Sequence, residues 1–192
     1  MSEQKSDENL IVSSDNFLPN KLTMGRIFAI PVFIVVFPMG FRVAACIIFI
    51  LASLTDMLDG YIARKYNMVS NFGKLMDPLA DKLLTMAAFV CLIETGDAAA
   101  WIVIIILGRE LIITGMRQVA AAQGIVIAAG VTGKIKTITQ MIAIPLLILD
   151  NWPCSIFAPA FPLDQIMLYI ALAMTIISGA EYIMKNKQLF AQ

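Results

Sequence analysis

Hydrophobic residues along the chain are gathered into six long runs, separated by short stretches of polar and turn-forming residues. The runs lie at roughly 24–40, 43–58, 79–94, 98–116, 125–149 and 164–184. A helix needs about 20 mostly apolar residues to cross a bilayer. The second and third runs reach that length only if each extends into the charged stretch between them. The pattern predicts an all-α integral membrane protein with six transmembrane helices.

Turn-forming residues lie at the joints between these predicted helices. The first 15 residues are polar and acidic, without the segments of a signal or transit peptide, so we expect a short mobile tail. No repeat interrupts the remainder, and residues 16–192 are predicted to form a single domain. The turn-forming residues are Pro38, Gly40, Gly96, Asp97, Gly124, Gly130, Gly133, Asp150, Asn151, Pro153, Pro159 and Pro162.

The composition requires lipid as the main solvent. The chain has 192 residues, of which 59% are hydrophobic and 15% charged, with a mean hydropathy of +0.82. A soluble domain of this length could not bury so much apolar surface. The zero net charge gives no sign of nucleic-acid binding, and the lack of histidine excludes histidine ligands and bases. Cys46, Cys91 and Cys154 are far apart, so we expect buried thiols without a disulfide.

Basic residues decide which side of the membrane each joint faces. Six spans place both termini on one side, and the joints on that side are rich in lysine and arginine. The opposite joints carry only Arg42 beside acidic residues. By the positive-inside rule both termini and residues 56–82 are cytoplasmic, as in a multi-pass protein of a bacterial plasma membrane. The basic residues are Lys21, Arg26, Arg64, Lys65, Lys74, Lys82, Arg109, Arg117, Lys134, Lys136, Lys185 and Lys187.

Four aspartates lie in the charged stretch DMLDGYIARKYNMVSNFGKLMDPLADK, residues 56–82. On a helix Asp56 and Asp59 share one face, and so do Asp77 and Asp81. With a turn near 71–73, two antiparallel helices would bring the four carboxylates together. Like charges that close favour a protonated carboxyl unless cations neutralise them. Oxygen-only ligands suit Mg²⁺, Mn²⁺ or Ca²⁺, so the spacing predicts a two-metal site for phosphoryl displacement.

Small residues and one arginine accompany the aspartates. Gly60, Ala63 and Gly73 allow close approach of a ligand or a neighbouring backbone. Arg64 is suited to bind a phosphate through two parallel hydrogen bonds. The alternative is a solvated cytoplasmic loop without a function. Four acids at helical spacing favour a functional site over that alternative.

The stretch resembles the signature of a known enzyme family. All eight fixed positions of the CDP-alcohol phosphatidyltransferases are present at the family's spacing. They read Asp56-x2-Asp59-Gly60-x2-Ala63-Arg64-x8-Gly73-x3-Asp77-x3-Asp81. The length and the six-span layout are similar to that family across nearly the whole chain.

The resemblance implies a binuclear metal site at the cytoplasmic side of a six-helix bundle, with Mg²⁺ favoured over Mn²⁺. Asp81 would also be the general base for the acceptor hydroxyl, and a homodimer is expected. The implied metal ligands are Asp56, Asp59, Asp77 and Asp81. The implied binding residues for the cytidine diphosphate part of the donor are Asp56, Gly60, Arg64 and Gly73, together with Asn20 and Thr23 considered below.

A second basic joint is the candidate site for the acceptor. A pocket for an anionic acceptor would be formed by Arg109, Arg117, Lys134 and Lys136. An arginine there can donate two parallel hydrogen bonds to a phosphate. Lys134 and Lys136 are two apart, so a regular helix cannot turn both toward one pocket. Glu110 shares a face with Arg117 and is expected to orient it. The alternative is plain membrane topology, in which snorkelling cations need no ligand.

Two glycines on the same segment suggest close helix packing. Gly108 and Gly115 are seven apart and form a small-residue face.

Several segments resemble the branch of the family whose acceptor is glycerol 3-phosphate. The resemblance implies transfer of the phosphatidyl group from CDP-diacylglycerol, giving phosphatidylglycerophosphate and CMP. In LPNKLTMGR, Asn20, Thr23 and Arg26 resemble residues near the nucleotide or phosphate. The alternative is that Asn20 or Thr23 caps the first helix. The segments are LPNKLTMGR at 18–26, GREL at 108–111, TGMR at 114–117 and GKIKT at 133–137.

Other functions are left open by these residues. Within the family, the acceptor could instead be inositol phosphate, serine or phosphatidylglycerol. A divalent-cation transporter would use the aspartates to bind its ion, although transporter sites usually lie near the bilayer midplane. A structural membrane scaffold would tolerate alanine at all four aspartates.

Overall fold

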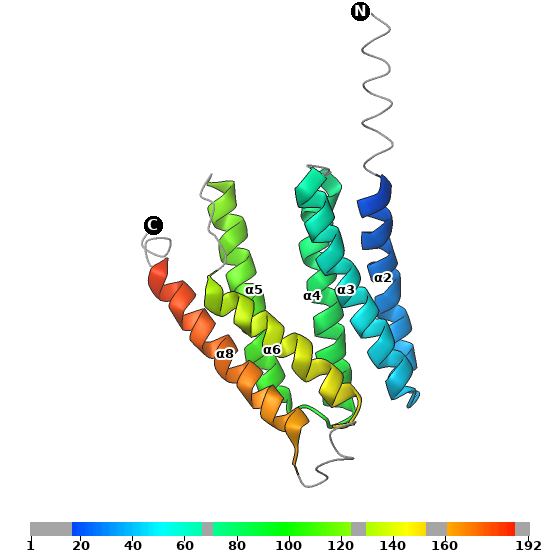
Figure 1. Cartoon of the computed structure of the whole chain (residues 1–192). Coiled ribbons are helices and arrows are strands. Elements are labelled where there is room, and N and C mark those ends of the chain that lie inside the picture. Colours follow the sequence, from blue (N-terminus) through cyan, green and yellow to red (C-terminus); the bar gives the residue numbers. More distant parts are fainter. Residues whose placement is uncertain (1–16, 67–70, 124–129, 153–160, 187–192) are drawn as a thin grey trace, which may run out of the picture. The chain divides into compact units, whose positions relative to one another are not determined.

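The computed structural model describes residues 17–66, 71–123, 130–152 and 161–186. These residues form six helices (Figure 1), and one helix coincides with each predicted apolar run, which confirms the all-α class. The predicted tail, residues 1–15, lies outside the described residues, and the single-domain extent stays a prediction. The helices are α2 (Phe17–Val36), α3 (Arg42–Tyr66), α4 (Asn71–Glu94), α5 (Ala100–Ala122), α6 (Val131–Ile148) and α8 (Leu163–Lys185).

The chain divides into two compact units, Met1–Ala88 and Phe89–Gln192. In the first unit, α2 packs against α3. Phe33 contacts Phe37 and Phe49, with ring centroids 5.7 and 6.4 Å apart, and all three rings are buried. The predicted turn between these helices is confirmed: Gly40 has a φ of 88°, a conformation that favours glycine.

The charged stretch continues both helices that flank it, as their apolar lengths predicted. Helix α3 extends to Tyr66, and α4 begins at Asn71. The prediction of a turn at residues 71–73 is wrong, because these residues form the first turn of α4. A glycine within a helix costs only about 1 kcal/mol relative to alanine, so Gly73 does not prevent a helix from starting here. The connection lies at 67–70, outside the described residues.

In the second unit, α8 packs against both α6 and α5. Buried residues recur every three or four positions, so each helix presents a stripe to its neighbours. Gln140 of α6 donates a hydrogen bond of 3.3 Å to the Thr175 hydroxyl of α8, within the buried interior. The stripe of α6 is Lys136, Gln140, Ala143, Ile144, Leu147 and Ile148. That of α8 is Asp164, Leu168, Ala171, Leu172, Thr175, Ser178, Gly179 and Tyr182.

Side-chain hydrogen bonds hold the turns at one end of the second unit. Gln165 donates to the Asp97 carbonyl at 2.9 Å, and Asn151 donates to the Phe161 carbonyl at 2.8 Å. Asn151 has a φ of 61°, a left-handed conformation that asparagine tolerates better than most residues. These bonds bring the start of α5, the end of α6 and the start of α8 to the same end of the unit.

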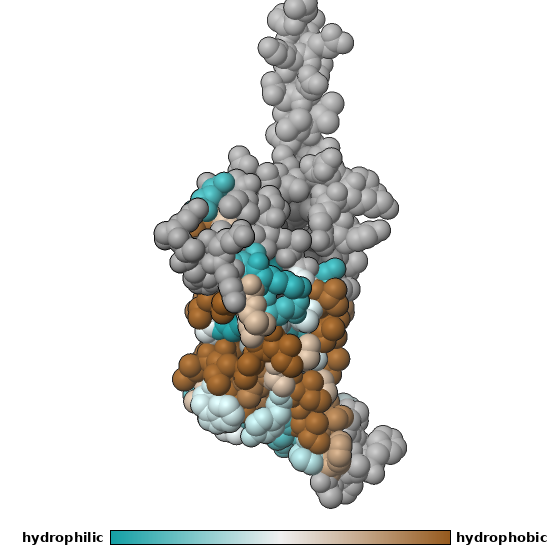
Figure 2. All heavy atoms as spheres, turned by 90° about the vertical axis from the view of Figure 1, so that its left-hand side faces the viewer, coloured by the Kyte–Doolittle hydropathy of each residue, from teal (hydrophilic) through white to brown (hydrophobic). Residues whose placement is uncertain are grey.

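The surface of the second unit is largely apolar. On the side that carries α8, Figure 2 shows a broad band of hydrophobic residues with hydrophilic residues toward one end. Helices α6 and α8 are long and apolar enough to cross a membrane, and shorter apolar segments occupy Ile27–Val36 and Arg42–Thr55. A helix that is apolar on all sides is typical of a membrane span. The number of spans and their orientation stay predictions.

Two of the three cysteines agree with the sequence analysis. Cys46 and Cys91 are buried, free thiols, while Cys154 lies outside the described residues.

Replacing Ala171 with leucine is expected to destabilise the second unit. Ala171 is fully buried in the stripe of α8, so three added heavy atoms have no free space, and overpacking costs about 1–3 kcal/mol. Thermal unfolding of the purified protein in detergent measures the loss as a lower midpoint. The matched control is Ala173→Leu, because Ala173 is exposed on the same helix. Equal midpoints for the two variants would contradict the packing described here.

Candidate functional site

The aspartate signature lies on two helices of the first unit. Asp56 and Asp59 lie in α3, whereas Asp77 and Asp81 lie in α4. The helical backbone at these positions supports the spacing argument that each pair shares a face. An all-carboxylate donor set fits hard divalent cations. The side chains of residues 56–81 are outside what the structure describes, so the metal site stays a prediction, and so do the roles of Gly60, Arg64 and Gly73.

The sequence allows two roles for Asn20 and Thr23, capping of the first helix or binding of the donor, and the helix bounds exclude capping. Helix α2 begins at Phe17, so both residues lie inside the helix. Because an N-cap residue precedes the first helical turn, neither residue caps α2 at this start. Their predicted place beside the donor nucleotide stays a prediction.

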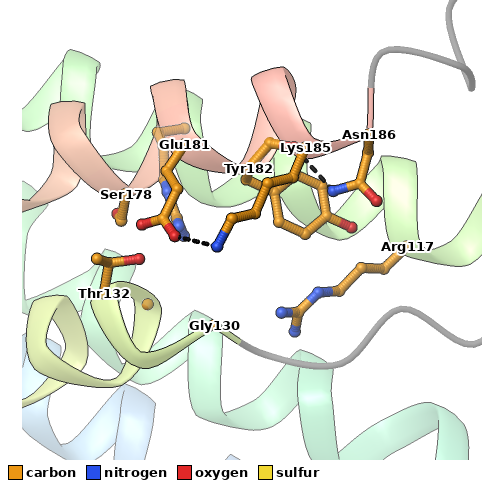
Figure 3. Close-up of a pocket in the computed structure, with 10 residues that line it drawn as sticks. Arg117, Gly130, Thr132, Ser178, Glu181, Tyr182, Lys185 and Asn186 are labelled. Atoms are coloured by element: carbon orange, nitrogen blue, oxygen red, sulfur yellow. Dashed lines mark hydrogen bonds and ion pairs between the residues drawn. The ribbon is translucent and has the colours of Figure 1, made fainter.

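A cavity of about 250 Å³ opens at the end of the second unit where α8 ends (Figure 3). It lies among the middle and second half of α5, the start of α6 and the last turns of α8. Among the described residues, three cations and one carboxylate line it, an excess of two positive charges. The lining residues are Arg109, Arg117, Gly130, Thr132, Gly133, Ser178, Glu181, Tyr182, Lys185 and Asn186.

Both arginines predicted to bind the acceptor line this cavity. Arg109 donates from Nη1 to Glu110 Oε1 at 3.0 Å. The Arg117 guanidinium lies 5.6 Å from the centroid of the Tyr182 ring. The Nε atoms of both arginines are buried and have no hydrogen-bond partner within the described part of the chain. Buried donors are normally satisfied, so these two suit a bound anion.

The Glu110 carboxylate joins α5 to α6. Its Oε1 accepts hydrogen bonds from Arg109 and from Lys136 Nζ. The Lys136 side chain is only 3% exposed and that of Glu110 18%, so this is a largely buried ion pair. The sequence analysis had assigned Glu110 to orient Arg117. The structure instead places the acid between Arg109 and Lys136, and Arg117 against Tyr182.

The two lysines face different ways, as their spacing predicted. Lys134 is exposed and Lys136 is buried, and neither lines the described cavity. Their direct binding of the acceptor stays a prediction. The position of Lys136 gives it a second role, in the ion pair with Glu110.

The sequence analysis missed the contribution of α8. Figure 3 shows Ser178, Glu181, Tyr182 and Lys185 projecting from the last turns of this helix. Lys185 had been counted only as a topological signal, although it pairs with Glu181 at 2.5 Å on the cavity wall. These polar residues are three or four apart at the end of the last apolar run. That spacing places them on one side of a helix and was the available signal.

A close approach between helices also occurs at a glycine that the sequence analysis did not single out. An added Cβ at Gly108 or Gly115 would meet nothing within 4 Å among the described residues. The described residues therefore give no support for a close-packed glycine face on α5, which stays a prediction. At Gly179 of α8, an added Cβ would lie 3.2 Å from Arg109 Cγ and 3.8 Å from Arg109 Nε.

Comparison with known families agrees with the aspartate signature. Residues 16–177 match the sequence profile of the CDP-alcohol phosphatidyltransferases. The chain belongs to the CDP-alcohol phosphatidyltransferase family. The match covers the transferase from the start of α2 into the second half of α8, and it includes the aspartates and both cavity arginines.

Relatives of the transferase cover nearly its full length. The CDP-diacylglycerol–glycerol-3-phosphate 3-phosphatidyltransferase of Bacillus subtilis is 45% identical over 184 residues, covering 88% of this chain and 94% of the relative. The protein of the same name from Rickettsia bellii is 39% identical, covering 92% and 98%. A probable phosphatidylglycerophosphate synthase of Mycobacterium tuberculosis is 37% identical, covering 86% and 79%.

Removing the shared carboxylate is expected to destabilise the transferase more than removing the lysine. Glu110→Gln leaves Lys136 buried beside a neutral amide, and breaking a buried ion pair costs about 3–5 kcal/mol. Lys136→Met costs less, because Glu110 keeps its hydrogen bond from Arg109 at 3.0 Å. Thermal unfolding in detergent measures both losses.

The double variant Glu110→Gln/Lys136→Met tests the coupling between the two residues. It is expected to recover part of the loss caused by Glu110→Gln, because the charge of Lys136, the more deeply buried of the two cations that share the carboxylate, is then removed, while Arg109 still lacks its carboxylate. Strictly additive losses, or a larger loss for Lys136→Met alone, would show that the pair does not stabilise the fold as described.

Proposed function

We propose that this transferase moves the phosphatidyl group from CDP-diacylglycerol to glycerol 3-phosphate, giving phosphatidylglycerophosphate and CMP. The names of the relatives supply the two substrates. The single structural observation that carries the acceptor assignment is the pair of unpartnered Nε donors on Arg109 and Arg117, in one cationic cavity. The eight-position aspartate signature carries the donor assignment.

The cavity chemistry suits a small phosphate monoester. A guanidinium presents Nε and one Nη along one edge, so it can hold two phosphate oxygens at once. Cavities for drug-sized ligands measure about 300–1,000 Å³. The volume of about 250 Å³ therefore favours a compact acceptor over a second phospholipid. Lys185 adds a third cation at the wall, and Glu181 can accept a hydrogen bond from an acceptor hydroxyl.

The donor half of the reaction is assigned to the first unit. Two divalent cations, Mg²⁺ or Mn²⁺, would be held by Asp56, Asp59, Asp77 and Asp81. The support for this assignment is the family resemblance and the all-carboxylate donor set. When bound, such ions neutralise charge on the phosphoryl oxygens and on the leaving group. The diphosphate and cytidine of the donor would be held by Asn20, Thr23, Asp56, Gly60, Arg64 and Gly73.

Asp81 is the proposed general base. Its carboxylate takes the proton from a hydroxyl of glycerol 3-phosphate, whose oxygen then forms a bond to the lipid-linked phosphorus. The bond from that phosphorus to the CMP oxygen breaks, and CMP leaves with the electron pair. Arg109 and Arg117 hold the acceptor phosphate while this happens, which reduces the entropic cost of bringing the hydroxyl into line.

The proposed setting is the plasma membrane of a bacterium. Six spans with both termini in the cytoplasm agree with the six helices and with the basic joints. This topology places the signature and the cavity on the cytoplasmic side, where glycerol 3-phosphate is available, while the acyl chains of the donor stay in the bilayer. A homodimer is proposed on family resemblance alone.

An acceptor panel tests the proposed substrate. Purified transferase is incubated with CDP-diacylglycerol and Mg²⁺, and CMP release is measured with glycerol 3-phosphate, inositol phosphate, serine or phosphatidylglycerol. We expect release with glycerol 3-phosphate at least about tenfold faster than with serine, which has no phosphate, because loss of a paired phosphate contact exceeds about 1.4 kcal/mol. Inositol phosphate and phosphatidylglycerol are also expected to react more slowly, because both are bulkier than glycerol 3-phosphate and the cavity measures only about 250 Å³. Release with another acceptor but not with glycerol 3-phosphate would refute the assignment.

Two treatments test the proposed chemistry of the aspartates. Chelation with EDTA is expected to abolish CMP release, and added Mg²⁺ to restore it, because unneutralised carboxylates would repel the diphosphate. Asp81→Asn is expected to stay inactive at any Mg²⁺ concentration while still binding the donor. The control is Asp97→Asn, whose aspartate lies at the opposite end of the second unit. Full activity of Asp81→Asn, or activity in EDTA, would contradict the mechanism.

A further inference from the structure

We propose that one turn of α8, carrying Gly179 and Tyr182, positions both arginines of the acceptor pocket. The inference rests on the proposed function, because it takes Arg109 and Arg117 as the groups that hold the acceptor phosphate. Gly179 and Tyr182 are three apart in the buried stripe of α8, so they share one helical face. That face contacts Arg109 at one residue and Arg117 at the other.

Gly179 fixes the path of the Arg109 side chain. A Cβ at this position would lie 3.2 Å from Arg109 Cγ, closer than carbon atoms pack without strain. Arg109 has little freedom to move away, because its side chain is only 15% exposed and Nη1 is held by Glu110. The missing side chain at residue 179 therefore lets the arginine stem lie against the backbone of α8. The buried Nε of Arg109, a residue that lines the cavity, then has no hydrogen-bond partner among the described residues.

Tyr182 supports the second arginine through its ring. The Arg117 guanidinium lies 5.6 Å from the ring centroid, within the range of a cation–π interaction. Figure 3 shows the guanidinium extending from Arg117 below the ring, toward the side of Gly130 and Thr132. The ring itself is buried, which limits its movement. A carboxylate partner would neutralise this arginine, whereas an aromatic face orients it and leaves its hydrogen-bond donors for a ligand.

Side-chain interactions within the end of α8 stabilise the turn that carries Gly179 and Tyr182. Asn186 donates from Nδ2 to the Tyr182 carbonyl at 2.8 Å, which satisfies an acceptor at the end of α8. Lys185 pairs with Glu181 one turn earlier. Farther along the same stripe, the Gln140 hydrogen bond to Thr175 sets the register of α8 against α6. The face of α8 that carries Gly179 and Tyr182, called the positioning face below, is therefore part of a regular helix and not of a loop.

Substitution of Gly179 tests the first contact. Gly179→Ala should shift Arg109 by a few tenths of an ångström, and misplacement on that scale costs severalfold in affinity. We expect the KM for glycerol 3-phosphate to rise about threefold or more, with the KM for CDP-diacylglycerol unchanged. Gly108→Ala is the matched control. It adds the same methyl group within a helix, but that group meets nothing within 4 Å among the described residues.

Paired substitutions of Tyr182 test the second contact. Tyr182→Leu removes the aromatic face, and loss of a partly buried cation–π contact corresponds to about a fivefold or larger rise in the KM for glycerol 3-phosphate. Tyr182→Phe keeps the face and should leave that KM within about twofold. An equal rise for both variants would show that the hydroxyl binds the ligand, and would overturn positioning by the ring.

A binding measurement separates this inference from the proposed reaction. Inorganic phosphate is titrated against the purified transferase, and the rise in its thermal unfolding midpoint gives the phosphate affinity. We expect weaker binding in Gly179→Ala and Tyr182→Leu, and unchanged binding in Gly108→Ala and Tyr182→Phe.

The outcomes of the two assays differ for the two hypotheses. Wild-type protein that binds phosphate but does not use glycerol 3-phosphate refutes the proposed acceptor, and the phosphate affinities then test the positioning face by themselves. Wild-type protein that uses glycerol 3-phosphate, with phosphate affinity and acceptor KM unchanged in Gly179→Ala and Tyr182→Leu, refutes the positioning face alone. Wild-type protein that binds no phosphate also refutes the positioning face.

Discussion

The second unit depends on a carboxylate that two cations share. Lys136 is almost fully buried, so its charge is stabilised by the ion pair with Glu110, and this pair links α6 to α5. The same oxygen holds Arg109, so the interaction that joins the two helices also sets the direction of a cavity arginine. Fold and site are thus not separable here, because one acid serves both.

Helix α8 completes the arrangement by a different physical means. It supplies no counter-ion to either arginine, and contributes a missing side chain at Gly179 and an aromatic face at Tyr182. The cations of the cavity lie where α8 ends, whereas the middle of its stripe is packed by apolar residues together with the Gln140–Thr175 hydrogen bond. Arg117 therefore faces an aromatic ring, and the Nε donors of both arginines have no partner among the described residues.

Much of this architecture is predictable from the sequence, and the exceptions have physical causes. Apolar runs located all six helices, and the length that a span requires showed that α3 and α4 continue into the aspartate stretch. Spacing along one helix separated Lys134 from Lys136 correctly. It could not show that Glu110 pairs with Lys136, because that contact joins different helices. Likewise, whether a glycine meets a neighbouring side chain depends on the adjacent helix, so spacing alone could not single out Gly179, where an added Cβ would lie 3.2 Å from Arg109 Cγ.

The position of Arg109 along α5 has a consequence for the surrounding lipid. Trp101 is exposed in the first turn of α5, as expected for a side chain at the membrane interface opposite the cavity. Arg109 follows eight residues later, about 12 Å along the helix, whereas the hydrocarbon core is about 30 Å thick. In the proposed membrane setting, the floor of the cavity then lies near the bilayer midplane. In that setting, water and a charged acceptor would have to pass below the phospholipid headgroups to reach Arg109.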